Sequence, residues 1–191
     1  MRFCLVTSNA DDASLNIKNN ILEKVAFRDK EKINNEIIYK ITENTVLIET
    51  NKDLIFFDEV EKYIQTDLLI FLSKHKSESG IPGFYVHSIG NFTSNTNLGG
   101  KPKFISYTSA YYIKKIFLKL FETSHEEFKD WKIGLEVTHH GPFIEKIPAI
   151  FLEIGSKQED WNNKKAGEII ANVILEIIKE EKENRYIPAV G

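Results

Sequence analysis

One polar segment, residues 73–82, concentrates side chains that can move protons or bind metal ions. It holds His75, Glu78, two lysines and three serines, and it follows directly after an apolar run. His75 and Glu78 could act as a base and its orienting carboxylate, or as two ligands of a metal. The same residue types also make ordinary solvated loops, so the segment alone leaves both interpretations open.

A second segment, residues 136–142, reads Glu-Val-Thr-His-His-Gly-Pro. On a strand, Glu136, Thr138 and His140 would share one face, and His139 would lie on the other. A charged residue in an otherwise apolar strand needs a partner if it is buried. Neighbouring histidines beside such a carboxylate indicate a metal site or a general acid and base, although adjacent histidines are also common as plain polar residues.

A third segment, residues 99–103, combines two glycines with Lys101 and Lys103. Glycines permit a close backbone approach, and the lysines add local positive charge that could bind phosphate. The segment lacks the Gly-Lys-Ser/Thr ending of a Walker loop. His87 lies inside an apolar strand candidate, where the pattern fits a core histidine somewhat better than a site residue.

Composition excludes several classes of protein. The 191 residues include 42% hydrophobic and 28% charged side chains, and the net charge of −3 argues against nucleic-acid binding through bulk charge. The single cysteine excludes a disulfide framework and a multi-cysteine zinc site. No segment approaches the roughly 18 apolar residues of a membrane span, and no signal peptide is recognisable. We therefore expect a cytoplasmic protein that is a monomer rather than an oligomer, with residues 1–191 in a single domain.

Strand and helix patterns alternate along the chain. Short apolar runs predict strands at residues 3–7, 37–41, 46–49, 68–72, 84–89, 131–137, 149–154 and 186–190. Apolar residues at helical spacing predict helices at residues 15–25, 107–121 and 159–181. This alternation predicts an α/β domain with a mixed, largely parallel sheet flanked by helices. The polar segments 73–80, 90–103, 138–145 and 155–160 all follow strand candidates, so they are expected to converge on one site.

Five motifs occur together in a fixed order. They are Ser-Glu-Ser-Gly-Ile-Pro at 77–82, Gly-Asn at 90–91, Gly-Gly-Lys-Pro at 99–102, Glu-Val-Thr-His-His-Gly-Pro at 136–142, and Glu-Ile-Gly-Ser at 153–156 followed by Trp161. The combination resembles the archaeal- and plant-type D-aminoacyl-tRNA deacylase family, from about residue 2 to the end. Members of that family usually continue into a glycine-rich segment with a histidine, whereas this sequence ends at Gly191.

The resemblance implies hydrolysis of the ester that joins a D-amino acid to the terminal adenosine of tRNA. It also implies zinc as a cofactor, the tRNA acceptor end as a partner, and a fold similar to peptidyl-tRNA hydrolases and nucleoside phosphorylases. The alternatives are an enzyme of one of those two related classes, or a non-catalytic module that grips the acceptor end of tRNA.

Candidate roles follow from the segments and the resemblance together. The catalytic candidates are His75, Glu78, Thr138 and His140. The candidate metal ligands are His75, Glu136, His139 and His140, with Glu78 as a further possible ligand. The candidate tRNA-binding residues are Lys74, Lys76, Lys101 and Lys103. The candidate backbone donors for an oxyanion are Gly80, Gly141 and Gly155. Two mechanisms stay open: zinc-activated water, or His75 or His140 as the base with a backbone oxyanion hole.

Overall fold

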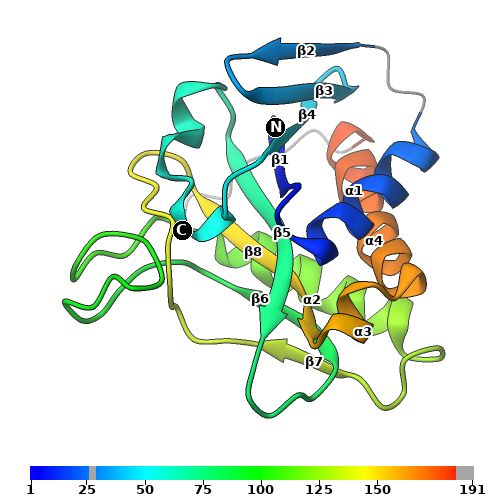
Figure 1. Ribbon diagram of the computed structural model, residues 1–191. Helices are drawn as coiled ribbons and strands as arrows, with labels where there is room; N and C mark the ends of the chain where they lie inside the picture. Colours follow the sequence, from blue (N-terminus) through cyan, green and yellow to red (C-terminus); the bar gives the residue numbers. More distant parts are fainter. Residues whose placement is uncertain (26–28, 184–191) are drawn as a thin grey trace.

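The computed structural model describes residues 1–25 and 29–183 of the chain. Within these ranges, eight strands form one sheet in the order β2-β3-β4-β1-β5-β8-β6-β7 (Figure 1). The strands are β1 (Phe3–Ser8), β2 (Lys30–Ile33), β3 (Glu36–Thr42), β4 (Thr45–Thr50), β5 (Leu68–Lys76), β6 (Gly83–His87), β7 (Lys132–Leu135) and β8 (Ala149–Ser156). The central strands β4, β1, β5 and β8 are parallel, whereas β3 and β6 run antiparallel to β4 and β8. The predicted mixed, largely parallel sheet is therefore confirmed.

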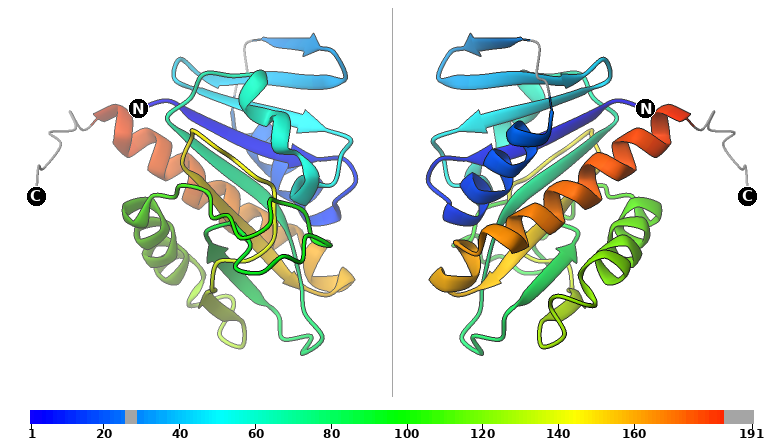
Figure 2. Two further views of the ribbon diagram at one scale, coloured as in Figure 1. Left: turned by 90° about the vertical axis from the view of Figure 1, so that its left-hand side faces the viewer. Right: turned by 90° about the vertical axis from the view of Figure 1, so that its right-hand side faces the viewer.

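The two faces of the sheet are covered differently. Three helices, α1 (Asp12–Lys24), α2 (Ala110–Ser124) and α4 (Lys164–Glu183), pack on one face (Figure 2). The other face is covered by two short 3-10 helices, η1 (Leu54–Phe56) and η2 (Asp58–Lys62), and by long loops. A four-residue helix, α3 (Gln158–Trp161), follows β8. Among the described residues, no helix combines the length and apolarity needed to cross a membrane.

The apolar run in β5 contributes to a hydrophobic core on each face of the sheet. Leu68, Ile70 and Leu72 pack into the helix-covered core, while Leu69 and Phe71 pack into the core on the loop-covered face. Side chains alternate across a strand, so a strand buried on both faces reads as a continuous apolar run. On the loop-covered face the burial comes from η1, η2 and neighbouring loops rather than from α-helices.

Helix α1 is attached to the central strand through a buried aspartate. Asp11 caps the helix, because its side chain accepts the backbone N–H of Ser14. Its second oxygen accepts the backbone N–H of Lys74 in β5 at 3.0 Å. Burial raises the pKa of Asp11 to about 6, although both hydrogen bonds oppose that rise. The aspartate therefore ties the start of α1 to the polar end of β5.

Two predicted boundaries were wrong for identifiable reasons. The loop expected from Ser73 begins later, because residues 73–76 continue β5 and pair with residues 153–156 of β8. The helix expected over 159–181 is divided into α3 and α4. Asn163 interrupts it by accepting the backbone N–H groups of Lys165 and Ala166 through its side chain, as a residue at a helix N-terminus does.

Other boundaries agree closely or fall outside the described ranges. The hairpin of β3 and β4 turns at residues 43–44, between the two runs that predicted it. Helix α2 begins at Ala110 rather than at 107, because Ser109 caps it. Strand β2 was not predicted, since its Lys-Glu-Lys-Ile sequence is largely exposed and has no apolar run. The strand predicted at 186–190 lies outside the described residues.

A buried ion pair connects α1 to the sheet. Lys18 Nζ lies 2.8 Å from Glu49 Oε2, and both side chains are almost completely enclosed. Asn9 and Tyr39 also donate hydrogen bonds to the Glu49 carboxylate. Burial raises the pKa of Glu49, but Lys18 and these hydrogen bonds outweigh burial and lower it. The ionised pair is therefore the stable state at neutral pH.

Removing one partner of this pair should destabilise the fold. We expect Glu49→Ala to lower the free energy of unfolding at pH 7 by about 3 to 5 kcal/mol, because it leaves a buried ammonium without a counter-ion. The double variant Lys18→Met/Glu49→Leu should lose much less. Because the pKa of Glu49 is lower in the folded than in the unfolded chain, its carboxylate adds to the free energy of unfolding at neutral pH. That stabilisation is lost as the pH falls through the pKa of Glu49 in the folded protein. Urea denaturation of both variants across pH measures this; equal stability of Glu49→Ala and the wild type would contradict it.

Candidate active site

The site begins where two paired strands change from apolar to polar on the loop-covered face. Phe71 of β5 and Phe151 of β8 stack with ring centroids 4.7 Å apart. The next residues on the same face of these strands are Ser73 and Glu153, which are also register partners. Ser73 Oγ donates to Glu153 Oε1 at 2.6 Å. A carboxylate thus lies in the middle of the sheet, directly beyond a stacked aromatic pair.

Glu153 is buried and ionised. Burial raises its pKa, but the neighbouring imidazoles of His87 and His140 and the hydrogen bond from Ser73 outweigh burial and hold the pKa well below its ordinary value. Its Oε2 lies 3.5 Å from His87 Nε2, and its Oε1 lies 4.0 Å from His140 Nε2. The carboxylate is therefore a fixed negative charge that the surrounding imidazoles face.

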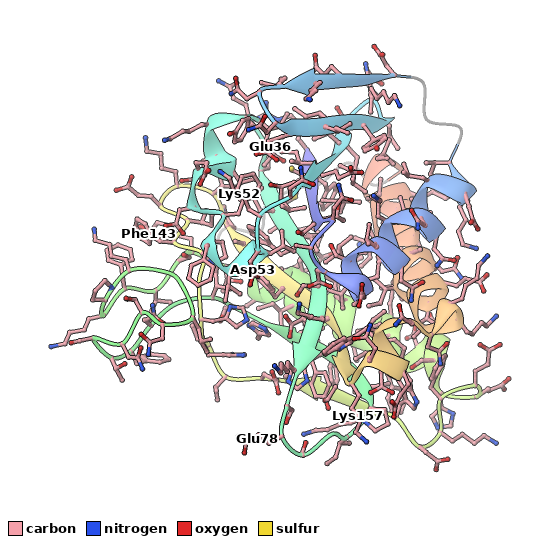
Figure 3. All side chains as sticks on the ribbon, viewed as in Figure 1. Glu36, Lys52, Asp53, Glu78, Phe143 and Lys157 are labelled. Carbon is pink, nitrogen blue, oxygen red and sulfur yellow. The ribbon has the colours of Figure 1, made fainter. Side chains whose placement is uncertain are left out.

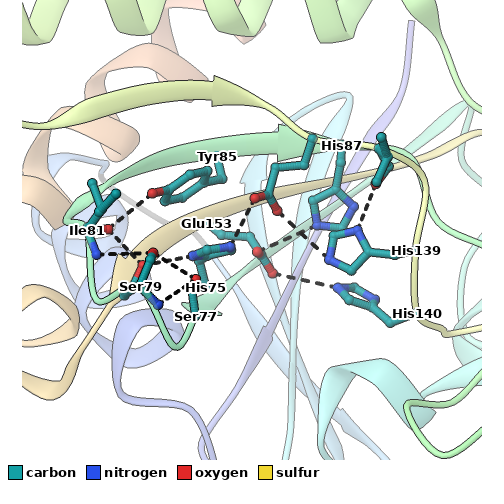
Figure 4. A network of polar contacts seen from close by, with 12 residues as sticks. His75, Ser77, Ser79, Ile81, Tyr85, His87, His139, His140 and Glu153 are labelled. Carbon is teal, nitrogen blue, oxygen red and sulfur yellow. Dashed lines mark hydrogen bonds and ion pairs between the residues drawn. The ribbon is translucent and has the colours of Figure 1, made fainter.

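Three histidines form a cluster beside this carboxylate (Figure 4). His87 ends β6, and His139 and His140 come from the loop after β7. One nitrogen from each of them lies within 4.8 Å of the others. In each ring Nδ1 contacts a backbone carbonyl oxygen: Ser88 O at 2.9 Å, Val137 O at 2.8 Å and Gly141 O at 2.6 Å. These acceptors place one ring proton on Nδ1, so the neutral form of each ring has its lone pair on Nε2.

This donor set fits zinc. Ligating histidines characteristically donate their second ring N–H to a carbonyl or carboxylate, as all three do here. Burial lowers the pKa values of His139 and His140, the latter to about 4, so both rings are neutral near pH 7. Burial also lowers the pKa of His87, but Glu153 outweighs it and raises that pKa. His87 Nε2 is buried and has no hydrogen-bond partner among the described residues.

A second cluster lies next to the first and centres on His75. Its Nε2 is 3.1 Å from Glu136 Oε1, and its Nδ1 is 3.1 Å from Ser156 Oγ. The Ser156 hydroxyl donates to Ile81 O at 2.8 Å, so it must accept from His75 Nδ1. The His75 ring also stacks on Tyr85, with centroids 3.8 Å apart. The imidazole is therefore fixed in orientation, with Nε2 directed at a carboxylate.

Both clusters border one cavity of about 410 Å³. Its polar wall includes Ser73, His75, His139, His140 and Glu153. The remaining lining residues are Asp11, Asp53, Leu54, Ile55, Lys74, Lys76, Leu98 and Phe151. A small ligand in this cavity would contact ionisable groups on one side and apolar side chains from η1 and the 90–103 loop on the other.

The predicted metal ligands separate into the two clusters. His139 and His140 join His87, whereas His75 and Glu136 group with Glu153. The two predicted sets remain neighbours, since Glu136 Oε2 is 3.9 Å from His139 Nε2.

Two predicted catalytic residues lie away from these groups. Glu78 is exposed at the outer end of the turn between β5 and β6 (Figure 3), and the structure does not bring it to His75. Thr138 Oγ1 hydrogen-bonds to Ser88 Oγ at 2.6 Å, which links the strand carrying His87 to the loop carrying His139.

The predicted tRNA-binding and backbone residues are also distributed. Lys74 and Lys76 line the cavity, whereas Lys101 and Lys103 are exposed on the 90–103 loop. Of the three glycines proposed as oxyanion donors, two already use their amides: Gly80 N–H donates to Ser77 O at 3.1 Å, and Gly141 N–H donates to Leu98 O at 2.8 Å. Gly155 lies in β8 and packs against His75.

Sequence reasoning missed two central residues. His87 was assigned to the core, and Glu153 was only part of a motif. Glu153 carried a usable signal, because it is an acid inside an otherwise apolar strand, the same signal that indicated Glu136. His87 had no comparable signal, since its role depends on the antiparallel pairing of β6 with β8.

The fold and the site together define an α/β enzyme with histidine and carboxylate side chains around one cavity. The family model described as D-aminoacyl-tRNA deacylase matches residues 62–191. Relatives named D-aminoacyl-tRNA deacylase include one from Methanocaldococcus jannaschii, 36% identical over 199 residues that cover 100% of this chain and 70% of the relative. Another, from Archaeoglobus fulgidus, is 34% identical and covers 98% of this chain and 67% of the relative. The chain belongs to the D-aminoacyl-tRNA deacylase family.

Solved structures agree with the fold. A crystal structure of a conserved protein of unknown function superposes with a TM-score of 0.86 at 32% identity, covering 96% of this chain and 65% of that one. A putative methylthioadenosine nucleosidase from Weissella paramesenteroides has a TM-score of 0.63 at 11% identity, covering 95% of this chain and 100% of that one. The second likeness shows the fold alone. The family match does not favour the phosphorylase or peptidyl-tRNA hydrolase alternatives.

The contact between Gly155 and His75 makes a specific prediction. A Cβ added at Gly155 would lie 2.6 Å from His75 Cβ and 2.7 Å from His75 Nδ1, so Gly155→Ala must displace the imidazole. We expect kcat for ester hydrolysis to fall by about a hundredfold, since small misplacements of a catalytic group have effects of that size. The control is Ile154→Val, on the opposite face of β8, which should cost about 1 kcal/mol of stability and leave kcat unchanged. Equal kcat values for the two variants would rule out this role for Gly155.

Proposed function

We propose that this chain hydrolyses the ester bond of D-aminoacyl-tRNA and releases the free D-amino acid and tRNA. The observation that carries the proposal is the pair of adjacent clusters on one cavity wall. Ester hydrolysis needs a polarised carbonyl, an attacking water and a proton for the leaving ribose oxygen. The histidine cluster and the His75–Glu136 pair can meet these needs from neighbouring positions, within 3.9 Å of each other at Glu136 and His139.

Zinc is proposed to bind at the histidine cluster. The Nε2 atoms of His87, His139 and His140 would hold it, in place of the mixed set that included His75 and Glu136. Zinc bound there would supply Lewis-acid polarisation of the ester carbonyl and of water. Glu153 balances positive charge from beneath the cluster, and Ser73 holds that carboxylate in one orientation through its 2.6 Å hydrogen bond.

The His75–Glu136 pair can hold the proton that the leaving group requires. His75 Nδ1 carries a hydrogen, because it donates to Ser156. The other ring nitrogen faces Glu136 Oε1 at 3.1 Å, and two acceptors at that distance must share a proton between them. That proton is positioned for transfer to the ribose oxygen as the ester bond breaks. Stacking on Tyr85 and the bond to Ser156 keep the ring from turning away.

The location and the assembly of the enzyme are part of the same proposal. A tRNA substrate places the reaction in the cytoplasm, where aminoacylated tRNA is used. The monomeric state stays a prediction from the sequence, and sedimentation of the purified chain measures it.

A time course on matched D- and L-tyrosyl-tRNA tests the proposed activity. We expect D-selective loss of the amino acid with the wild type, and strong inhibition by a chelator that zinc reverses. His75→Ala should lower kcat by at least about a hundredfold, the scale of general acid catalysis. It should retain the zinc content of the wild type, measured by mass spectrometry, because His75 belongs to the second cluster.

Three outcomes would contradict the proposal. Absence of D-selective hydrolysis in the zinc-loaded wild type would exclude the proposed activity. Activity that persists unchanged after the metal is completely removed would exclude a role for zinc in the mechanism. A loss of less than about threefold in His75→Ala would remove the proton-transfer role of the pair.

A further inference from the structure

We infer that a strip of exposed aromatic and apolar side chains beside the cavity binds the unpaired bases at the 3′ end of tRNA. The rim strip consists of the exposed side chains of Phe56, Leu98, Lys101 and Phe104 and the half-buried ring of Phe143. This inference rests on the proposed function and extends it, since the cavity holds only the esterified end of the substrate. The bases that precede the terminal nucleotide must then lie on the surface next to the cavity.

The strip begins at the mouth of the cavity. Leu98 lines the cavity and is nevertheless 59% exposed, so it belongs to both the wall and the outer surface. Phe56 is 51% exposed and follows Ile55, another lining residue. A Cβ at Gly99 would lie 3.4 Å from the Phe56 ring, which shows that η1 and the 90–103 loop are in contact there. Two exposed apolar side chains, one from each segment, therefore flank this contact at the rim.

The strip continues outward to a pair of rings and a cation. Phe104 is 40% exposed and packs edge-to-face against Phe143, with centroids 4.6 Å apart. Figure 3 shows Phe143 on the loop-covered side of the sheet. Lys101 Nζ lies 5.0 Å from the Phe104 centroid and 5.1 Å from that of Phe143. Within the described part of the chain, Lys101 forms no ion pair, so its charge is available to a phosphate.

The loop that carries Leu98, Lys101 and Phe104 is held against the histidine cluster by backbone contacts. Asn91 donates from its side chain to Gly99 O at 2.8 Å, and the Gly90 N–H donates to His140 O at 2.9 Å. Gly99 and Gly100 both have φ of +77°, a conformation that favours glycine. A Cβ at Gly141 would lie 2.2 Å from Gly100 N, so the two loops touch backbone to backbone. This part of the strip is thus fixed in position relative to the site.

Exposed rings interleaved with lysines are the combination that binds single-stranded nucleic acid. Bases stack on aromatic side chains without sequence preference, and lysines contact the intervening phosphates. Lys103 adds a second cation two residues from Lys101. A protein partner or a second copy of the chain would not require these charges beside the rings, so we commit to the unpaired RNA end as the occupant.

The test compares two RNA hairpins that differ only at the end. One carries four unpaired 3′ nucleotides and the other is blunt; neither is aminoacylated. Fluorescence anisotropy with the zinc-loaded, full chain gives Kd for each. We expect the wild type to prefer the tailed hairpin, and Phe104→Ala to raise its Kd by about tenfold, the effect of losing one stacked base. Phe104→Trp should restore binding. Lys101→Met should reduce the slope of log Kd against log salt concentration by about the amount expected for one lost phosphate contact.

The control is Phe121→Ala, which removes a ring that is 51% exposed on α2, on the helix-covered face. It should bind like the wild type. In a parallel assay, Phe104→Ala should raise KM for D-tyrosyl-tRNA and leave the hydrolysis of D-tyrosyl-adenosine unchanged, because Phe104 does not line the cavity that would hold that small ester.

The outcomes separate this inference from the proposed function. Equal affinity for tailed and blunt hairpins, or equal effects of Phe104→Ala and Phe121→Ala, would overturn the proposed role of the rim strip even if D-selective hydrolysis is observed. A preference for the tailed hairpin that is abolished by Phe104→Ala would support that role even if no hydrolysis occurs. Sedimentation that shows a dimer broken by Phe104→Ala would assign the strip to self-association and would overturn the inference.

Discussion

A buried carboxylate dictates much of the arrangement around it. Glu153 lies on a central strand whose neighbouring positions are apolar, and a carboxylate there is stable only if other groups compensate its charge. Ser73 on β5 supplies a hydrogen bond, and His87 and His140 supply nearby imidazoles. The three come from different segments, so compensating Glu153 draws β5, β6 and the loop after β7 into one place.

The unequal covering of the sheet gives this carboxylate access to a ligand. The three long helices bury the opposite face of the sheet in a largely apolar core. On the loop-covered face, apolar packing ends at Phe71 and Phe151, and the cavity begins directly beyond that pair. The loops that contain Gly100 and Gly141 pack backbone to backbone and hold the histidines over the sheet. The face that the three long helices leave uncovered is therefore the face that carries the site.

Sequence patterns predicted the layers and the identity of most polar segments, but not their pairing. The apolar run in β5 indicated a strand buried on both faces, and His75, His139 and His140 stood out by type. Which histidines share a cluster depends on strand direction: β6 runs antiparallel to β8, so His87 pairs with Phe151 and meets His139. Period-2 alternation does not reveal direction or register, so the two clusters were predicted as one mixed set.

We propose that the Nε2 atoms of His87, His139 and His140 converge on one zinc ion. X-ray absorption at the zinc edge of the zinc-loaded chain tests it most directly, because imidazole ligands have a distinctive scattering signature. We expect one bound zinc with three histidine nitrogens in the wild type, and one histidine nitrogen fewer in His87→Gln. A spectrum without histidine scattering, or one that His87→Gln leaves unchanged, would contradict it.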